Sequence, residues 1–260
     1  MQAERTEARN ACCPYRQTLC VILENVNIQE ETYRILGERL ITNFNSKKLV
    51  DWALMLVENG YESENLIILA GLYNDSTEEI EKYFWKTIED LKINTNKPDE
   101  ELIEIYALQL VEDVIAGRIN PLNGLALMQD VIQATDYSNR FVQFYDLDED
   151  LDYLQYEGKP LYNSGLNSNN KEEFVLEEFK IFLEMENLQI ESDIREKSYC
   201  PKCGQFEKAI LKTKYQFRKP FKYQIWVCGN CGSAKLEHFS SQIVKRKLID
   251  RIKNNTQHTV

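Results

Sequence analysis

The chain has 260 residues, of which 43% are hydrophobic and 28% are charged, and its formal net charge at pH 7 is −11. This composition is typical of a globular protein that builds a core, and it excludes a disordered or fibrous chain. The best apolar run, from Leu66 to Tyr73, is far shorter than the roughly 20 residues of a membrane-spanning helix, which excludes such a span.

Residues 1–27 predict a flexible extension. The segment from Met1 to Gln17 is polar and lacks the apolar core of a secretory signal peptide, so we expect a cytoplasmic protein. Cys12, Cys13 and Cys20 lie in this extension without a second Cys-x-x-Cys pair or a histidine nearby, and they predict no metal site.

Residues 28–190 predict an acidic α-helical domain. Apolar residues recur at helical spacing in stretches that begin after serine caps or near prolines, and several of these stretches end at glycines. The predicted helices are 49–57, 64–72, 77–91, 102–115, 122–134 and 172–188. Helices of this length with short turns indicate a multi-helix bundle or a short helical array. In composition and helix order, residues 52–153 resemble helical bacterial proteins of uncharacterised function.

A long loop is predicted over residues 156–170, as a surface excursion or a partner-binding loop. The densest group of acids precedes it, at Asp146, Asp148, Glu149, Asp150 and Asp152. A calcium-binding EF-hand loop needs glycine at its sixth position, where this chain has Leu151. We therefore expect these acids on the polar face of one element, and a metal-dependent enzyme that uses them is an alternative hypothesis.

Near the C-terminal end, two Cys-x-x-Cys pairs are formed by Cys200, Cys203, Cys228 and Cys231. A glycine follows each pair, which suits a backbone position of positive φ. Four thiolates from two such turns can hold one Zn²⁺, and a closed four-sulfur shell is structural because a catalytic zinc keeps one position open. Disulfides or redox pairs are the alternatives, and disulfides are rare in reducing compartments.

The 24 residues between the pairs predict a β-hairpin that turns around 218–220. In both arms, mostly apolar or aromatic residues occupy every second position: Leu211, Thr213, Tyr215, Phe217, Phe221, Tyr223, Ile225 and Val227. With 217 opposite 221, these residues share one face, and Trp226 falls on the other face with Lys212, Lys214 and Lys222. An isolated hairpin is marginal in water, so we expect metal binding to stabilise it.

Residues 196–239 resemble the zinc-ribbon family, in which CPxCG and CxxCG knuckles bracket a β-hairpin. The resemblance covers about a sixth of the chain. It implies that Cys200, Cys203, Cys228 and Cys231 are the ligands of one structural zinc. Zinc ribbons occur in transcription factors, ribosomal proteins, nucleic-acid enzymes and protein-binding modules, so the resemblance implies a fold element and a metal but no activity.

Residues 240–260 predict a basic amphipathic helix and a tail. Ser240 and Ser241 offer an N-cap, and Val244, Leu248 and Ile252 form an apolar stripe. The net charge is +10 over residues 196–260, with 14 Lys/Arg and 4 Asp/Glu, and −21 over residues 1–195, with 17 and 38. The basic part therefore either docks on the acidic body or contacts an external polyanion such as DNA or RNA.

Motifs of common enzyme classes (G-x-S-x-G, G-x-x-x-x-G-K-[ST], G-x-G-x-x-G and H-E-x-x-H) do not occur. We expect a non-catalytic adaptor or regulatory protein whose zinc ribbon contacts a protein partner or nucleic acid, with no membrane partner. The candidate contact residues are Lys212, Lys214, Arg218, Lys222, Trp226, Lys245 and Arg246. A further alternative is an acidic inhibitor or immunity-type protein that uses the helical body, with a purely structural ribbon.

Overall fold

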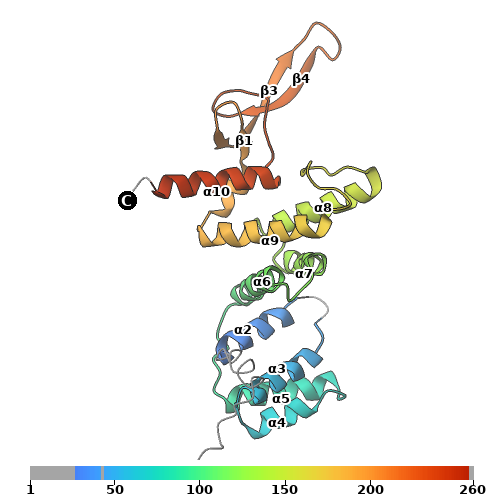
Figure 1. Ribbon diagram of the computed structural model, residues 1–260, viewed down its shortest axis with the longest axis vertical. Helices are drawn as coiled ribbons and strands as arrows, with labels where there is room; N and C mark the ends of the chain where they lie inside the picture. The colour runs from blue at the N-terminus through green and yellow to red at the C-terminus, as the bar shows by residue number, and fades with distance from the viewer. Residues whose placement is uncertain (1–26, 42–43, 258–260) are drawn as a thin grey trace, which may run out of the picture. The chain divides into compact units, whose positions relative to one another are not determined.

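The computed structural model describes residues 27–41 and 44–257 (Figure 1). In these ranges the chain is mainly α-helical, with two small antiparallel sheets and a terminal helix, which confirms the predicted fold class. Cys12, Cys13 and Cys20 lie outside the described residues. None of the helices in the described ranges is long and apolar enough to cross a membrane.

The chain divides into two compact units. The first contains the described residues up to Leu36 and those from Phe44 to Lys97, and the second contains residues 37–41 and 98–257. This division differs from the predicted one, because it falls inside the acidic stretch and places the ribbon in one unit with the later helices. The physical reason is an apolar cluster, described below, that joins the ribbon to two of these helices.

The first unit contains most of α2 (Ile28–Arg39), then α3 (Lys47–Glu58), α4 (Glu64–Gly71) and α5 (Thr77–Asp90). The Ser63 hydroxyl accepts a hydrogen bond from the Leu66 N–H at 3.1 Å, and the Ser76 hydroxyl accepts one from the Glu79 N–H at 3.3 Å. These bonds satisfy N–H groups that a helix start leaves unpaired, and they confirm both predicted helix starts.

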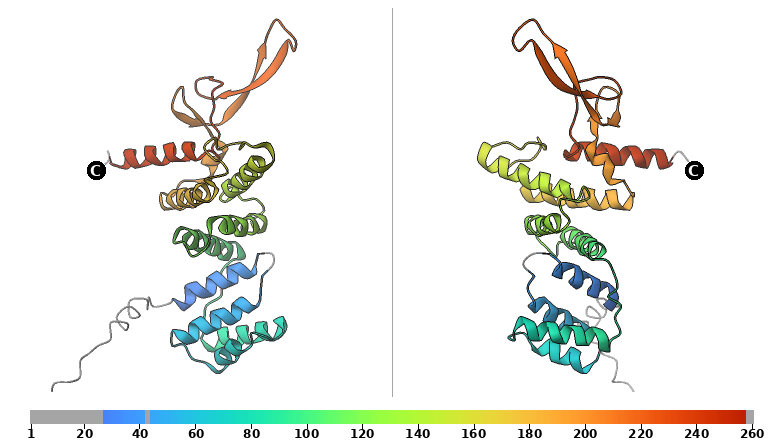
Figure 2. Two further views of the ribbon diagram at one scale, coloured as in Figure 1. Left: turned by 45° about the vertical axis from the view of Figure 1, so that its right-hand side comes forward. Right: turned by 180° about the vertical axis from the view of Figure 1, so that it is seen from behind.

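The second unit contains α6 (Asp99–Ile115), α7 (Pro121–Ala134), α8 (Val142–Glu157), α9 (Lys171–Asn187) and α10 (Gln242–Gln257). The pairs α6–α7 and α8–α9 lie in successive layers, and α10 runs beside α9 (Figure 2). The buried ring of Phe144 lies 4.8 Å from Phe179 and 5.2 Å from Phe182, centroid to centroid, which joins α8 to α9. Helix α8 carries the acid cluster and was not among the predicted helices.

After the 3-10 helix η1 (Ser192–Glu196), the ribbon forms two antiparallel strand pairs. Strand β1 (Ser198–Cys200) pairs with β2 (Gln205–Glu207), and β3 (Ala209–Tyr215) pairs with β4 (Lys222–Cys228). The predicted hairpin is therefore confirmed as an element, and a short second hairpin precedes it.

The predicted register of the β3–β4 hairpin is wrong by one residue. Tyr215 pairs with Lys222 and Leu211 with Trp226, and a hydrogen bond from the Gln216 N–H to the Phe221 carbonyl at 3.0 Å closes the turn. Because both faces of this hairpin are largely exposed to water, its apolar pattern does not select a register, and the turn sets it. Trp226 consequently shares its face with Lys222 but not with Lys212 or Lys214.

Candidate metal centre

The four cysteine sulfurs converge on one point. Cys200 Sγ lies 3.6 Å from Cys231 Sγ, and Cys203 Sγ lies 3.7 Å from Cys228 Sγ. All four sulfurs lie within 4.8 Å of one another. Four sulfurs about 2.3 Å from a central ion stand about 3.8 Å apart in a tetrahedron, so the observed spacing fits a metal ion.

The first cysteine pair lies in the turn between β1 and β2. Cys200 is the last residue of β1, and its carbonyl accepts a hydrogen bond from the Gly204 N–H at 2.8 Å. Gly204 has a φ of 67°, a conformation in which side chains are strained. The turn folds Cys203 back toward Cys200.

The second cysteine pair repeats this geometry at the end of β4. The Gly232 N–H donates to the Cys228 carbonyl at 2.9 Å, and Gly232 has a φ of 71°. Cys228 also pairs with Ala209 at the start of β3, so the longer hairpin fixes the position of this turn. The positive φ predicted from the two glycines is therefore confirmed.

The chemistry of the four sulfurs suits a soft or borderline cation. All four cysteines are free thiols, and their spacing is well above the 2.05 Å of a disulfide bond. Burial raises the pKa of the Cys200 thiol, but the backbone N–H groups of Cys203 and Lys202 stabilise its thiolate and lower the pKa to about 6, whereas the backbone N–H of Ser233 lowers the pKa of Cys231 but burial and the neighbouring sulfurs outweigh it and raise that pKa to about 11. The thiolate is the form that ligates a metal.

The ribbon is seated on the helices of its own unit. Tyr199 and Glu237 exchange backbone hydrogen bonds of 3.0 and 2.9 Å, and Arg251 of α10 donates to the Gly204 carbonyl at 2.9 Å. Tyr199 and Phe206 pack on a buried cluster of α9, α10 and the segment before α10: Ile181, Met185, Phe239, Val244, Leu248 and Ile249. The metal-site end of the ribbon is therefore packed against α9 and α10.

The longer hairpin, in contrast, projects away from the helices of its unit (Figures 1 and 2). Every residue from Leu211 to Lys222 is exposed, and Phe217 at its tip is exposed completely. Five cations of this segment form no ion pair with any described residue: Lys212, Lys214, Arg218, Lys219 and Lys222. Of the predicted contact residues, those on the hairpin are therefore accessible.

The prediction for Lys245 and Arg246 is corrected by the structure. Lys245 is 1% exposed and pairs with the equally buried Glu178 of α9, while Arg246 pairs with Glu177 and Glu184. An amphipathic helix was expected, but the sequence did not show that its cations lie against α9. Both residues therefore do not belong to the exposed contact surface of the hairpin, because they pair with acids of α9.

The acids between 146 and 152 do not converge on one point. Asp150 is fully buried and accepts hydrogen bonds from the N–H groups of Leu161, Tyr162 and Asn163 at 2.5, 2.8 and 3.0 Å. The expected place of Asp150 on the polar face of an element is therefore wrong. The three backbone amides take the place of water around its carboxylate. In the described ranges, the cysteines are the one group of three or more metal-ligating side chains close enough to share an ion.

Sequence reasoning missed how the predicted loop ties the ribbon to the helices. Asn163 Oδ1 accepts a hydrogen bond from the Gln242 N–H at 2.9 Å and so caps α10 from 79 residues away. Ser240, expected as the cap, instead donates to Asp146. In the sequence, the available signal was an acid cluster followed by an Asn-rich loop. Assigning Asp150 of that cluster to the loop requires the tertiary structure.

His238 is exposed and stacks on Tyr162 with ring centroids 5.0 Å apart. Its Nδ1 lies 2.9 Å from Ser240 Oγ.

A family model described as an uncharacterized protein conserved in bacteria (DUF2225) matches residues 188–260. The matched segment contains the four cysteines, all four strands and α10, and it lies outside the stretch 52–153 whose helix order resembled bacterial proteins. The description names no activity and does not identify a zinc ribbon. No curated protein and no solved structure matches the chain.

Proposed function

We propose that this protein is a non-catalytic, zinc-binding regulatory protein whose β3–β4 hairpin contacts single-stranded nucleic acid. The zinc would be held by Cys200, Cys203, Cys228 and Cys231, whose thiol donor set and sulfur spacing support a four-coordinate ion. Bound zinc supplies a cross-link between the two turns. It has no position for a substrate, because the four sulfurs close its coordination shell.

The metal assignment is tested by elemental analysis of reduced, purified full-length protein. We expect one zinc per chain, and we expect Cys203→Ser to reduce the zinc content sharply. Serine at Cys12, Cys13 and Cys20 is the matched control and should leave zinc unchanged. Stoichiometric iron in place of zinc would correct the metal, because four thiolates also suit iron. Protein without any metal would refute the site.

One observation carries the proposed contact: the hairpin presents exposed aromatic rings together with unpaired cations. Tyr215 is 77% exposed and Trp226 is 59% exposed, and both lie on the face of Lys222. Arg218 and Lys219 lie in the adjacent turn. Proteins that bind single strands without sequence preference combine such stacking surfaces with cations that hold the phosphates.

Nucleic acid is favoured over a protein partner by this combination of charge and stacking surface. The five hairpin cations have no ion pair among the described residues, so they are free to neutralise phosphates. Protein interfaces, in contrast, tend to be depleted in lysine at their core. The rings stand among these lysines, which suits bases stacked on the rings and phosphates held beside them.

The contact is tested by fluorescence anisotropy with labelled oligonucleotides and the full-length, zinc-loaded protein. If Arg218, Lys219 and Lys222 each neutralise one phosphate, the slope of log K against log[salt] is about −2, so affinity falls roughly 20-fold from 50 to 200 mM salt. Trp226→Ala should weaken binding roughly 5- to 150-fold, which corresponds to about 1–3 kcal/mol for one stacked base.

The register supplies a sharper comparison within the hairpin. Lys222→Glu should weaken binding more than Lys214→Glu, because only Lys222 shares a face with Trp226. Tyr156→Ala and Lys159→Glu, at exposed positions next to the end of α8, are the matched controls and should have no effect. Absent or salt-independent binding would refute the nucleic-acid contact, and a hairpin-dependent protein partner would then be the correct alternative.

A further inference from the structure

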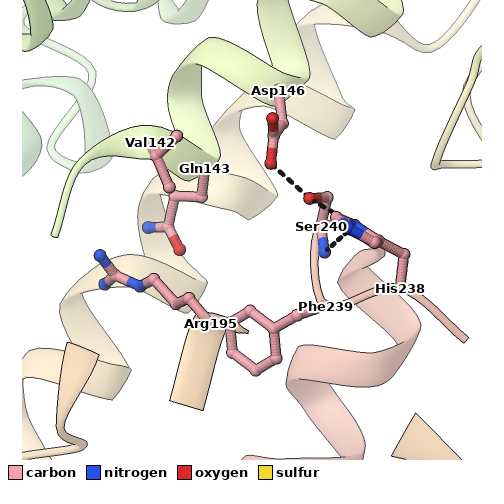
Figure 3. Close-up of a pocket in the computed structure, with 7 residues that line it drawn as sticks. All are labelled: Val142, Gln143, Asp146, Arg195, His238, Phe239 and Ser240. Atoms are coloured by element: carbon pink, nitrogen blue, oxygen red, sulfur yellow. Dashed lines mark hydrogen bonds between the residues drawn. The ribbon is translucent and has the colours of Figure 1, made fainter. Parts of the chain in front are cut away.

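A small pocket lies in the second unit, between α8, η1 and the segment that joins the ribbon to α10 (Figure 3). Its volume is about 220 Å³, which is below the 300–1,000 Å³ of pockets for drug-sized ligands and suits a smaller molecule. Its lining residues are Val142, Gln143, Asp146, Arg195, His238, Phe239 and Ser240. The site is separate from the metal centre and from the exposed hairpin.

One side of the pocket carries polar groups that no described residue satisfies. Gln143 is 2% exposed, yet neither its amide oxygen nor its amide nitrogen has a hydrogen-bond partner in the described chain. The same is true of the Nε of Arg195. Buried polar groups are normally paired, and leaving three such atoms together unpaired costs free energy that a bound ligand would recover.

Arg195 also lacks a carboxylate partner. Among the described residues its guanidinium makes one hydrogen bond, from Nη1 to the carbonyl of Asn139, so Nε and Nη2 remain available. These two nitrogens form the edge that binds a carboxylate through two parallel hydrogen bonds. Burial lowers the pKa of Arg195 to about 10, against the attraction of Glu186 and Glu178, so the group stays cationic at neutral pH.

The opposite side of the pocket carries an acceptor. Asp146 accepts a hydrogen bond from the Ser240 hydroxyl through one carboxylate oxygen, and its second oxygen accepts no hydrogen bond from the described chain. Figure 3 shows Gln143 and Arg195 on one side of the pocket, with Asp146, Ser240 and His238 on the other and Phe239 between them. A molecule in the pocket therefore meets donors at one end and an anionic acceptor at the other.

We propose that this pocket binds a small carboxylate that also carries a hydrogen-bond donor, such as an amino acid or a hydroxy acid. Arg195 and the Gln143 amide nitrogen bind the carboxylate, and Asp146 accepts from the amino or hydroxyl group. Phe239 and Val142 cover the carbon skeleton. Because three separate segments line the pocket, the ligand would also tie α8 to the segment between the ribbon and α10.

The proposal is tested by saturation-transfer NMR on the full-length, zinc-loaded protein. The probes are acetate, L-alanine and L-lactate, with acetamide and methylammonium as controls that lack the carboxylate, and inorganic phosphate as a different anion. We expect signals from the carboxylates, stronger for L-alanine and L-lactate than for acetate. Absence of carboxylate signals, or displacement of the carboxylates by phosphate at equal concentration, would overturn the assignment.

Variants separate ligand binding from folding. Gln143→Leu removes a buried unpaired amide and should leave thermal stability equal or higher, while it weakens L-alanine binding at least tenfold. Asp146→Asn should weaken L-alanine at least threefold but leave acetate within twofold. Arg218→Lys, on the exposed hairpin, is the control for Arg195→Lys. Unchanged L-alanine binding in both Gln143→Leu and Arg195→Lys would refute the site.

Discussion

The buried ion pair between Lys245 and Glu178 provides a direct test of how α10 is held. Both side chains are 1% exposed, and the second carboxylate oxygen of Glu178 has no hydrogen-bond partner in the described chain. Lys245→Met keeps most of the apolar length of the side chain but leaves the glutamate without its cation. Breaking a buried pair in this way typically costs about 3–5 kcal/mol. We expect that loss to appear as weaker docking of α10 on α9.

Hydrogen exchange of the α10 amides, followed by mass spectrometry on the full-length protein, measures this docking locally. A loss of 3–5 kcal/mol corresponds to exchange that is roughly 100 to several thousand times faster, provided that the amides exchange by local opening. The local readout matters because the chain has two units and a metal site, so a single unfolding free energy is not well defined.

The double variant Lys245→Met/Glu178→Leu distinguishes a lost attraction from an unpaired buried charge. Replacing both charges by apolar groups is often neutral or stabilising, so we expect protection close to that of the unmodified protein. Lys253→Met is the control, since Lys253 is 52% exposed and its pair with Glu184 should contribute at most about 1 kcal/mol. Unchanged exchange in Lys245→Met, or no recovery in the double variant, would contradict this reasoning.

Three further predictions concern other parts of the fold. Asp150→Ala should cost about 3–5 kcal/mol and speed proteolysis within residues 158–170, because three backbone N–H groups, of which that of Asn163 is buried, lose their acceptor, whereas the exposed Asp152→Ala should change stability by less than about 0.5 kcal/mol. Gly124→Ala should cost about 1–3 kcal/mol of stability and lower the melting temperature, since a Cβ would lie 2.3 Å from Val114 Cγ2, whereas Gly71→Ala, with open space around it, should be neutral or slightly stabilising. Burial raises the pKa of Glu184, but its ion pairs with Lys253 and Arg246 outweigh burial and lower the pKa, so its stabilisation is fully present above the ordinary pKa of a glutamate and is lost as the pH falls through the lowered value. Urea midpoints at about pH 6 and pH 3 should therefore differ less in Glu184→Gln than in the unmodified protein, and equal differences would contradict the pairing.

Local signals in the sequence determined most of the helices and the metal-site cysteines, although α2 and α8 were not predicted. The Ser63 and Ser76 hydroxyls accept hydrogen bonds from N–H groups only three residues away. Gly204 and Gly232 adopt a positive φ within their own turns. The Cys-x-x-Cys spacing likewise encodes a turn that brings two sulfurs together. Such features are visible in sequence because each depends on residues within a few positions.

Tertiary structure alone decided which charges and polar groups meet. The cations of α10 were readable as one face of a helix, but their partners in α9 lie more than 60 residues earlier, at Glu177, Glu178 and Glu184. The cap of α10 comes from Asn163, and the hairpin register comes from a turn because neither face of that hairpin is buried. Periodicity shows which residues share a face, whereas the surface that covers that face is set by packing between distant elements.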